Sequence, residues 1–127
     1  MKTPSLIIIH GPSASGKSTV AELVKTQIKP SVHLGSDRLR FHITDFRIDN
    51  KKENFDITRD IMMGMVRDYL KKGFSVVVED QLRDEHVETL LEISRELEVS
   101  CNIYETSATR EALLERITER RVAQGEL

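Results

Sequence analysis

Gly11-Pro12-Ser13-Ala14-Ser15-Gly16-Lys17-Ser18 decides the fold of this chain, because it matches the pattern G-x-x-x-x-G-K-[ST] at every fixed position. The run SLIII at residues 5–9 precedes it and is short, apolar and β-branched, which predicts a fully buried strand. Residues 19–25 follow it with helical spacing, and Val20, Leu23 and Val24 share the predicted inner face. The motif therefore lies between a strand and a helix, as a phosphate-binding loop does.

The residue types of this loop explain how it would bind phosphate. Its glycines allow a tight turn that brings several backbone N–H groups near one anion, and the following helix directs its positive end there. Lys17 can reach the β- and γ-phosphates of a nucleotide, and the Ser18 hydroxyl can bind Mg²⁺. The alternative is a glycine-rich turn without a ligand. The residues predicted to hold the nucleotide are Gly11, Ser13, Ala14, Ser15, Gly16, Lys17, Ser18 and Thr19.

Length and composition limit the remaining possibilities. The 127 residues suit a single domain over 1–127. A net charge of −2 argues against a strongly basic nucleic-acid surface. Cys101 is the only cysteine, so no intramolecular disulfide can form, and a reducing, cytoplasmic compartment is expected. No signal peptide is recognised, and no apolar run approaches about 18 residues, so no membrane association is expected.

Strands and helices alternate along the chain. The further strand candidates are residues 32–34, 74–78 and 100–104. The predicted helices begin near Ser36, run over 56–72 and 84–97, and resume after Ala108, while residues 42–54 are interpreted as a loop. In the helix over 56–72, Ile57, Ile61, Met65 and Tyr69 form the expected inner face. This order predicts a three-layer α/β fold with a mainly parallel, helix-covered sheet.

In such a sheet, ligands bind beyond the carboxyl ends of the strands. Asp37 follows the second strand, where a phosphoryl transferase needs a carboxylate that accepts the proton of the attacking hydroxyl. Asp37 is therefore predicted to be this base or to help hold Mg²⁺ through water; the alternative is a helix-start carboxylate that only stabilises the helix dipole. Arg38 and Arg40 are predicted substrate contacts, because arginine binds phosphate and carboxylate bidentately, and the alternative is a solvated helix face.

Asp80 ends the apolar run V-V-V-E-D of residues 76–80. An acid at the end of a hydrophobic strand is the Walker-B arrangement, which positions Mg²⁺. Asp80 is therefore the predicted metal residue beside Ser18. Glu79 competes for this role, because the end of a strand cannot be located to one residue from the sequence.

Arg116 and Arg120 lie four residues apart on one face of the last predicted helix. In a phosphotransferase they would close over the transferred phosphate and stabilise the transition state. Glu115 and Glu119 support the alternative of a charge-paired, solvated helix. The four histidines, His33 among them, form no metal-ligand pattern.

Together these residues resemble the small P-loop kinases of the nucleoside-monophosphate-kinase-like group. The similarity is to the branch of polynucleotide kinase, zeta toxin and chloramphenicol phosphotransferase, often labelled AAA-type ATP-binding domains. It rests on G-P-S-A-S-G-K-S-T at 11–19, S-D-R-L-R at 36–40, V-V-V-E-D at 76–80 and R-x-x-x-R-R at 116–121. The resemblance implies that Lys17 and Ser18 hold ATP and Mg²⁺, that Asp37 serves the acceptor hydroxyl, and that Arg116 and Arg120 belong to a mobile lid.

The resemblance also implies a fifth strand and a last helix, for which no candidate follows residue 121. A short variant, a C-terminal truncation and a strand swapped in from a partner chain at an open sheet edge are three expectations that fit. The predicted activity is an ATP- and Mg²⁺-dependent phosphotransferase acting on a hydroxyl of a small molecule or nucleotide. The alternatives are a non-catalytic ATP- or GTP-binding module and a polynucleotide 5′-hydroxyl kinase, and the acidic net charge does not favour a nucleic-acid partner.

Overall fold

The computed structural model describes residues 3–12, 16–39 and 51–106, where strands and helices alternate as the sequence predicts. All four predicted strands form, and the helix expected over 84–97 has those bounds. The elements are β1 Ser5–His10, α1 Lys17–Gln27, β2 Ser31–Leu34, α2 Ser36–Leu39, α3 Lys51–Lys71, β3 Ser75–Asp80, α4 Asp84–Leu97 and β4 Ser100–Glu105.

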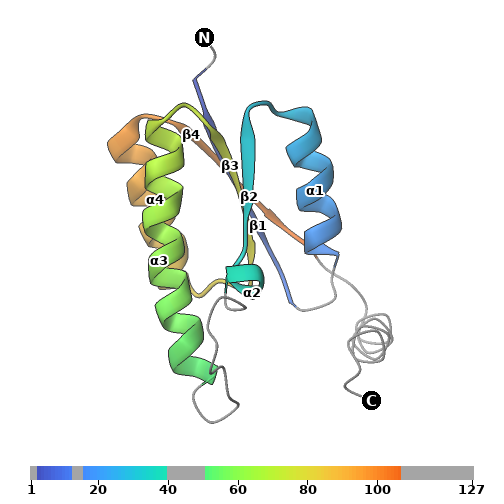
Figure 1. The fold of residues 1–127 in the computed structure, drawn as a ribbon, viewed down its shortest axis with the longest axis vertical. Helices are drawn as coiled ribbons and strands as arrows, with labels where there is room; N and C mark the ends of the chain where they lie inside the picture. The colour runs from blue at the N-terminus through green and yellow to red at the C-terminus, as the bar shows by residue number, and fades with distance from the viewer. Residues whose placement is uncertain (1–2, 13–15, 40–50, 107–127) are drawn as a thin grey trace.

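The described strands form one parallel sheet in the order β2-β3-β1-β4. Helix α1 lies on one face of the sheet, and α3 and α4 lie on the other, which gives three layers (Figure 1). Side chains alternate between these faces. Leu6 and Ile8 of β1 point to the α3–α4 side, whereas Ile7 and Ile9 point to α1. The predicted three-layer α/β architecture is thus confirmed.

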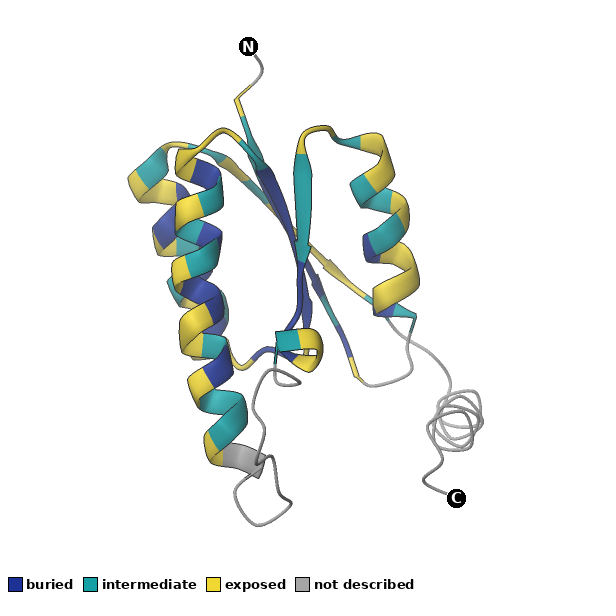
Figure 2. Ribbon diagram, in the orientation of Figure 1, coloured by how far each residue is buried: buried dark blue, intermediate teal, exposed yellow. Residues whose placement is uncertain are grey.

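The two central strands, β1 and β3, carry the core. The side chains of β3 are buried along its whole length, and the four middle residues of β1 are buried as well (Figure 2). Strand β3 extends two residues beyond the predicted 74–78 segment and includes Glu79 and Asp80. Consecutive residues in a strand face opposite sides, so these two acids are directed to different layers.

The predicted inner face of α1 is right for Val24, which packs against the core, and wrong for Val20 and Leu23. Val20 is 38% exposed and Leu23 is 59% exposed, and the buried residues of this helix are Lys17 and Ala21. Helix α1 begins with Lys17 facing inward and buried. Ala21 and Val24 lie about one and two helical turns after Lys17 and therefore share its face.

Helix α3 corrects two further expectations. It begins at Lys51, so residues 51–54 of the predicted loop are helical. Ile57 and Ile61 of the predicted face are 46% and 59% exposed, whereas Met65 and Tyr69 of that face are partly buried against the core. Met62 and Val66 are fully buried. Apolar residues occur on both sides of this helix, and contact with the sheet selects the face that contains the longer series Met62, Val66 and Leu70. The final predicted helix, including Arg116 and Arg120, lies outside the described residues, as does the expectation of a missing last strand.

Adjacent residues of α3 offer a direct test of the observed rotation. We expect Met62→Ala to lower the free energy of unfolding by about 2–5 kcal/mol, since it empties a buried site. Ile61→Ala should change it by less than about 0.5 kcal/mol, because that side chain is largely solvated. Urea denaturation of both variants measures this, and a larger loss from Ile61→Ala would contradict the observed rotation.

Candidate functional site

The parallel sheet brings the predicted site segments to one edge. The phosphate-binding loop follows β1, helix α2 follows β2, and the acids Glu79 and Asp80 end β3 (Figure 1). The Gly11 N–H donates to the Asp80 carbonyl oxygen at 3.4 Å, so the start of the loop is tied to the end of β3. This is the convergence expected at the carboxyl ends of parallel strands.

Lys17 begins α1 and is buried, with 7% of its surface exposed. Gly16 immediately before it has φ +92°, a left-handed conformation that other residues adopt only with strain. This turn directs Lys17 back over its own loop, where its Nζ donates to the Pro12 carbonyl oxygen at 3.1 Å. A buried ammonium group therefore lies at the start of the helix, where an anion is also favoured by the backbone N–H groups.

Ser18 and Glu79 connect the loop helix to the central strand. The Ser18 hydroxyl donates to Oε1 of Glu79 at 2.8 Å. Glu79 reaches Ser18 because it lies on the α1 side of β3, two residues beyond Val77 of the same layer. A hydroxyl and a carboxylate side by side are hard oxygen donors of the kind that Mg²⁺ prefers.

Glu79 is only 8% exposed, yet it is held in its ionised form. Burial raises the pKa of this carboxyl, but the contacts with His33 and Ser18 and the nearby charge of Lys17 outweigh burial and hold the pKa below its ordinary value. The site therefore contains a buried negative charge within the field of a buried lysine.

Asp80 lies on the opposite face, toward α3. Its Oδ1 accepts the Gln81 N–H at 2.8 Å and lies 3.5 Å from a guanidinium nitrogen of Arg59, which stacks over the Phe55 ring at 5.2 Å. Of the two acids considered for the metal, the contacts favour Glu79, since Glu79 and not Asp80 meets Ser18. The role of either acid in metal binding stays a prediction.

Helix α2 approaches the end of β3 through Gly35. A Cβ at this position would lie 2.9 Å from the Glu79 carbonyl oxygen and 3.4 Å from its Oε1, so only glycine allows this approach without displacement. Asp37 is in the first turn of α2 and is exposed at the same edge. Arg38 is exposed and donates to Glu22 Oε1 at 3.3 Å.

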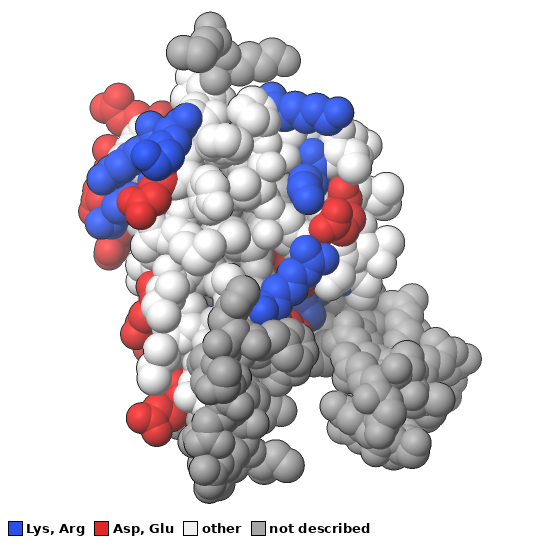
Figure 3. All heavy atoms as spheres, in the orientation of Figure 1, with Lys and Arg blue, Asp and Glu red and all other residues white. Residues whose placement is uncertain are grey.

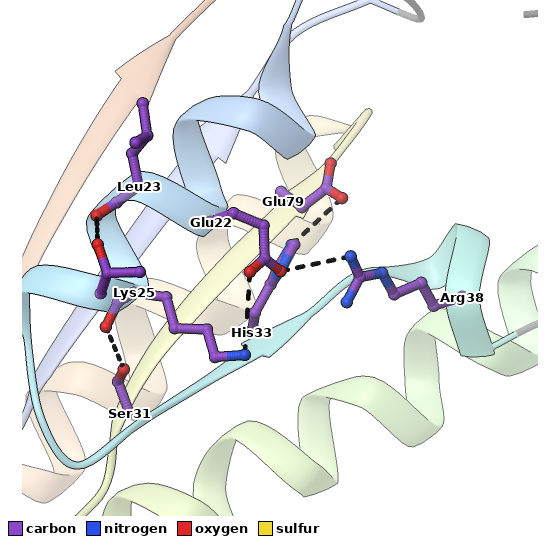
Figure 4. Close-up of polar contacts among 8 residues, drawn as sticks. Glu22, Leu23, Lys25, Ser31, His33, Arg38 and Glu79 are labelled. Carbon is purple, nitrogen blue, oxygen red and sulfur yellow. Dashed lines mark hydrogen bonds and ion pairs between the residues drawn. The ribbon is translucent and has the colours of Figure 1, made fainter.

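Glu22 and His33 are two residues of the site that the sequence patterns did not predict and that the structure adds (Figure 4). The His33 Nδ1 lies 2.7 Å from Glu22 Oε1, and its Nε2 lies 3.2 Å from Glu79 Oε1. Opposite Val77 in the β2–β3 register, His33 shares the face of Glu79. That neighbourhood becomes visible only when the strand order is known, since the two residues are 46 positions apart in sequence.

Several predicted site residues lie outside the described part of the chain. The structure therefore does not place the loop residues Ser13, Ala14 and Ser15, the substrate residue Arg40, or the lid residues Arg116 and Arg120. Among the described residues, no group of three or more His, Cys, Asp or Glu side chains could hold a metal by itself. Mg²⁺ in phosphate sites usually takes one or two protein oxygens and completes its shell with phosphates and water, which suits Ser18 and Glu79.

The sequence identifies the family to which this fold and site belong. Residues 6–126 match the AAA domain model, and the chain therefore belongs to the AAA domain family. No curated protein matches the sequence. Within the described residues, no helix is sufficiently long and apolar to cross a membrane.

Solved structures show the same architecture in kinases. A candidate kinase from Chloroflexus aurantiacus J-10-fl superposes with a TM-score of 0.84 at 23% sequence identity, over 98% of this chain and 69% of that one. A gluconokinase from Sinorhizobium meliloti 1021 gives a TM-score of 0.63 at 22% identity, over 94% and 67%. The APS kinase of Mycobacterium tuberculosis, solved with AMPPNP and APS, gives 0.60 at 18%, over 100% and 78%. The fold is thus that of the small P-loop kinases.

Two glycines test the close packing around Glu79. We expect Gly35→Ala to lower the free energy of unfolding by about 1–3 kcal/mol, because the added methyl group overlaps the β3 backbone. Gly64→Ala is the matched control: nothing lies within 4 Å of its Cβ position in α3, so alanine should stabilise the helix by about 0.5–1 kcal/mol. Denaturant unfolding distinguishes them, and an unaffected Gly35→Ala variant would contradict the contact.

The ionised Glu79 makes stability depend on pH. Because the folded protein lowers the pKa of this group, its contribution is complete above the ordinary glutamate pKa and is lost as pH falls toward the folded pKa. We expect the free energy of unfolding to fall in this acid window in the wild type, and to fall less in Glu79→Gln. Urea denaturation across the window measures both slopes, and equal slopes would exclude this role for Glu79.

Proposed function

We propose that this protein is an ATP- and Mg²⁺-dependent phosphotransferase that moves the γ-phosphoryl group to a hydroxyl acceptor. The observation that carries the proposal is the 2.8 Å hydrogen bond from Ser18 to Glu79, made beside the buried Lys17. A loop that only closed a turn would need neither a buried ammonium group nor a buried carboxylate at the start of its helix. Both suit a site where phosphate and a divalent cation meet.

The nucleotide side of the site consists of the loop and the first turn of α1. Gly16 and the N–H groups at the helix start would bind phosphate oxygens, and Lys17 would turn from the Pro12 carbonyl to the β- and γ-phosphates. Ser18 would bind Mg²⁺ directly, and Glu79 or Asp80 would help to hold it through water; the bound ion would neutralise charge on the transferred group. The remaining loop residues Gly11, Ser13, Ala14, Ser15 and Thr19 complete the proposed phosphate cradle.

The acceptor side is proposed to be α2. The acceptor oxygen forms a bond to the γ-phosphorus while the bond to the bridging β–γ oxygen breaks, and ADP leaves with that oxygen. The hydroxyl proton passes to the carboxylate of Asp37, which is exposed at the carboxyl edge. Arg38 and Arg40 would bind the acceptor, and Arg116 and Arg120 would stabilise charge on the transferred phosphoryl group.

A small-molecule acceptor is favoured over a nucleic acid. The structural neighbours do not decide the acceptor, because they include a gluconokinase and an APS kinase, whose names give small molecules, and a chain of the Pnkp1/Rnl/Hen1 RNA repair complex, whose name gives RNA; the charge of this chain decides it instead. On the face shown in Figure 3, the described Lys and Arg side chains lie in separate groups with acidic side chains beside them, and they do not form one continuous basic stripe. The net charge of −2 agrees with this choice, because phosphate-backbone binding requires clustered positive charge.

Two substitutions test the activity. Lys17→Ala should abolish measurable binding of AMPPNP with Mg²⁺, since it removes the positive charge that meets the phosphates. Asp37→Asn should keep AMPPNP binding but lower acceptor-dependent ADP release by about 10²–10⁴-fold, because it cannot take the acceptor proton. Isothermal titration measures the first effect, and ADP release with a panel of sugars, polyols and nucleosides measures the second.

Asp68→Asn is the matched control for Asp37→Asn, because Asp68 is an exposed carboxylate near the far end of α3. It should change neither quantity. AMPPNP binding without ADP release for any acceptor, oligonucleotides included, would favour the non-catalytic module. Salt-sensitive phosphorylation of an oligonucleotide would instead favour the 5′-hydroxyl kinase.

A further inference from the structure

We propose that His33 is a positioning residue of this site: it fixes the Glu79 carboxylate on Ser18, and Glu22 in turn fixes His33. The inference rests on the proposed function, because it gives these two residues a part in binding the metal–nucleotide complex. Neither residue belongs to the phosphate-binding motif or to the acid pair at the end of β3.

The imidazole ring of His33 is clamped between two carboxylates from different elements (Figure 4). Its Nδ1 lies 2.7 Å from Oε1 of Glu22 on α1, and its Nε2 lies 3.2 Å from Oε1 of Glu79 on β3. The His33 side chain is only 1% exposed. Nδ1 makes the hydrogen bond with Glu22, whereas Nε2 faces Glu79 at ion-pair distance without a hydrogen bond of its own, and rotation of the buried ring would remove both contacts.

His33 acts on the same oxygen that holds Ser18. Oε1 of Glu79 receives the Ser18 hydroxyl at 2.8 Å and faces His33 Nε2 at 3.2 Å. The Gly35 backbone closes a third side, since a Cβ there would lie 3.4 Å from this oxygen. Glu79 is thereby enclosed by α1, β2 and the β2–α2 turn, which together favour one orientation of its carboxylate.

The orientation matters because a hydroxyl has one hydrogen and two lone pairs. When Ser18 donates its hydrogen to Glu79, its lone pairs remain for a cation. If Glu79 turned away, the Ser18 hydroxyl would be free to rotate, and its lone pairs would no longer be held toward the cation. Hydrogen-bonded groups behind a metal ligand typically change metal affinity by about 10–100-fold when they are removed.

Glu22 links this cluster to the surface. Its carboxylate is also met by Arg38 at 3.3 Å and by Lys25 at 4.0 Å, with about half of each of these side chains exposed. Exposed ion pairs contribute little because water screens them. The hydrogen bond with the buried ring of His33 is therefore the contact through which Glu22 acts on the site.

The experiment is AMPPNP titration of the full chain with and without Mg²⁺. His33→Leu removes both ring nitrogens at similar volume, and we expect it to keep Mg²⁺-free binding through Lys17. The Mg²⁺ concentration that gives half of the maximal enhancement of AMPPNP binding should rise about tenfold or more. His33→Gln, whose amide can still donate to a carboxylate, should recover part of this loss.

His86→Leu is the matched control, because His86 is a buried histidine that accepts the Arg83 N–H at the start of α4. It should lower stability without changing the Mg²⁺ requirement. An unchanged Mg²⁺ requirement in a folded His33→Leu protein would overturn the inference. If His33→Leu fails to fold, Glu22→Gln replaces it, and a Mg²⁺ requirement unchanged in Glu22→Gln has the same meaning.

A second readout needs no nucleotide. Long-range ¹H–¹⁵N spectra of the free protein at one pH should show that Glu79→Gln shifts the Nε2 resonance of His33 and that Glu22→Gln shifts its Nδ1 resonance. If neither resonance moves, the clamp does not exist and the inference fails. If the wild type shows the clamp but binds no AMPPNP, the proposed function fails, and so does the positioning role.

Discussion

The parallel pairing of β1 with β3 is the constraint on which the site depends. Its register places Ile9 opposite Glu79, so the strand that leads into the phosphate-binding loop ends beside the strand that supplies the acids. The loop then returns into α1 on the Glu79 side of the sheet, where Ser18 meets that carboxylate at 2.8 Å. A shift of one residue would direct Asp80 to α1 and Glu79 to α3, because strand side chains alternate between faces.

The buried ionisable side chains next to Ser18 lower the stability that a chain of this size could otherwise reach. Three ionisable side chains, Lys17, His33 and Glu79, are largely removed from water on the α1 side of the sheet. Removing one partner of a buried charged pair costs about 3–5 kcal/mol, whereas apolar replacements of the whole group are often neutral or stabilising. Stability alone would therefore favour an apolar cluster here, and retention of the charges agrees with a site that binds a charged ligand.

The sequence predicts this fold well where one local signal determines the outcome. The apolar run before the loop and the G-x-x-x-x-G-K-S spacing predicted β1, the turn at Gly16 and the start of α1 near Lys17. The helix rotations were harder, because Val20 in α1 and Ile61 in α3 are apolar residues on the solvent side. Local spacing gives a helix but not the face that the sheet will cover.

The candidate site shows the same limit. Lys17 and Ser18 follow from their motif, but the choice between Glu79 and Asp80 depends on where β3 ends, and the position of His33 depends on which strand pairs with β3. Strand order is a property of the whole sheet, and no pattern around His33 encodes it. Residues that act through a neighbour on another strand are therefore the part of the site that cannot be predicted from the sequence.

The two adjacent acids of β3, Glu79 and Asp80, lie on opposite faces of the sheet and have different partners. On the α3 side, Arg59 lies 3.5 Å from Asp80 and also donates to the Gln81 carbonyl oxygen at 3.2 Å, so a fixed cation compensates this acid and connects α3 to the end of β3. On the α1 side, Glu79 is met by a histidine and a hydroxyl, with Lys17 nearby but bonded to its own loop. The carboxylate without a dedicated arginine is the one that faces the phosphate-binding loop. A cation arriving with a nucleotide would complete its charge balance, while Asp80 and Arg59 would continue to hold the helix in place.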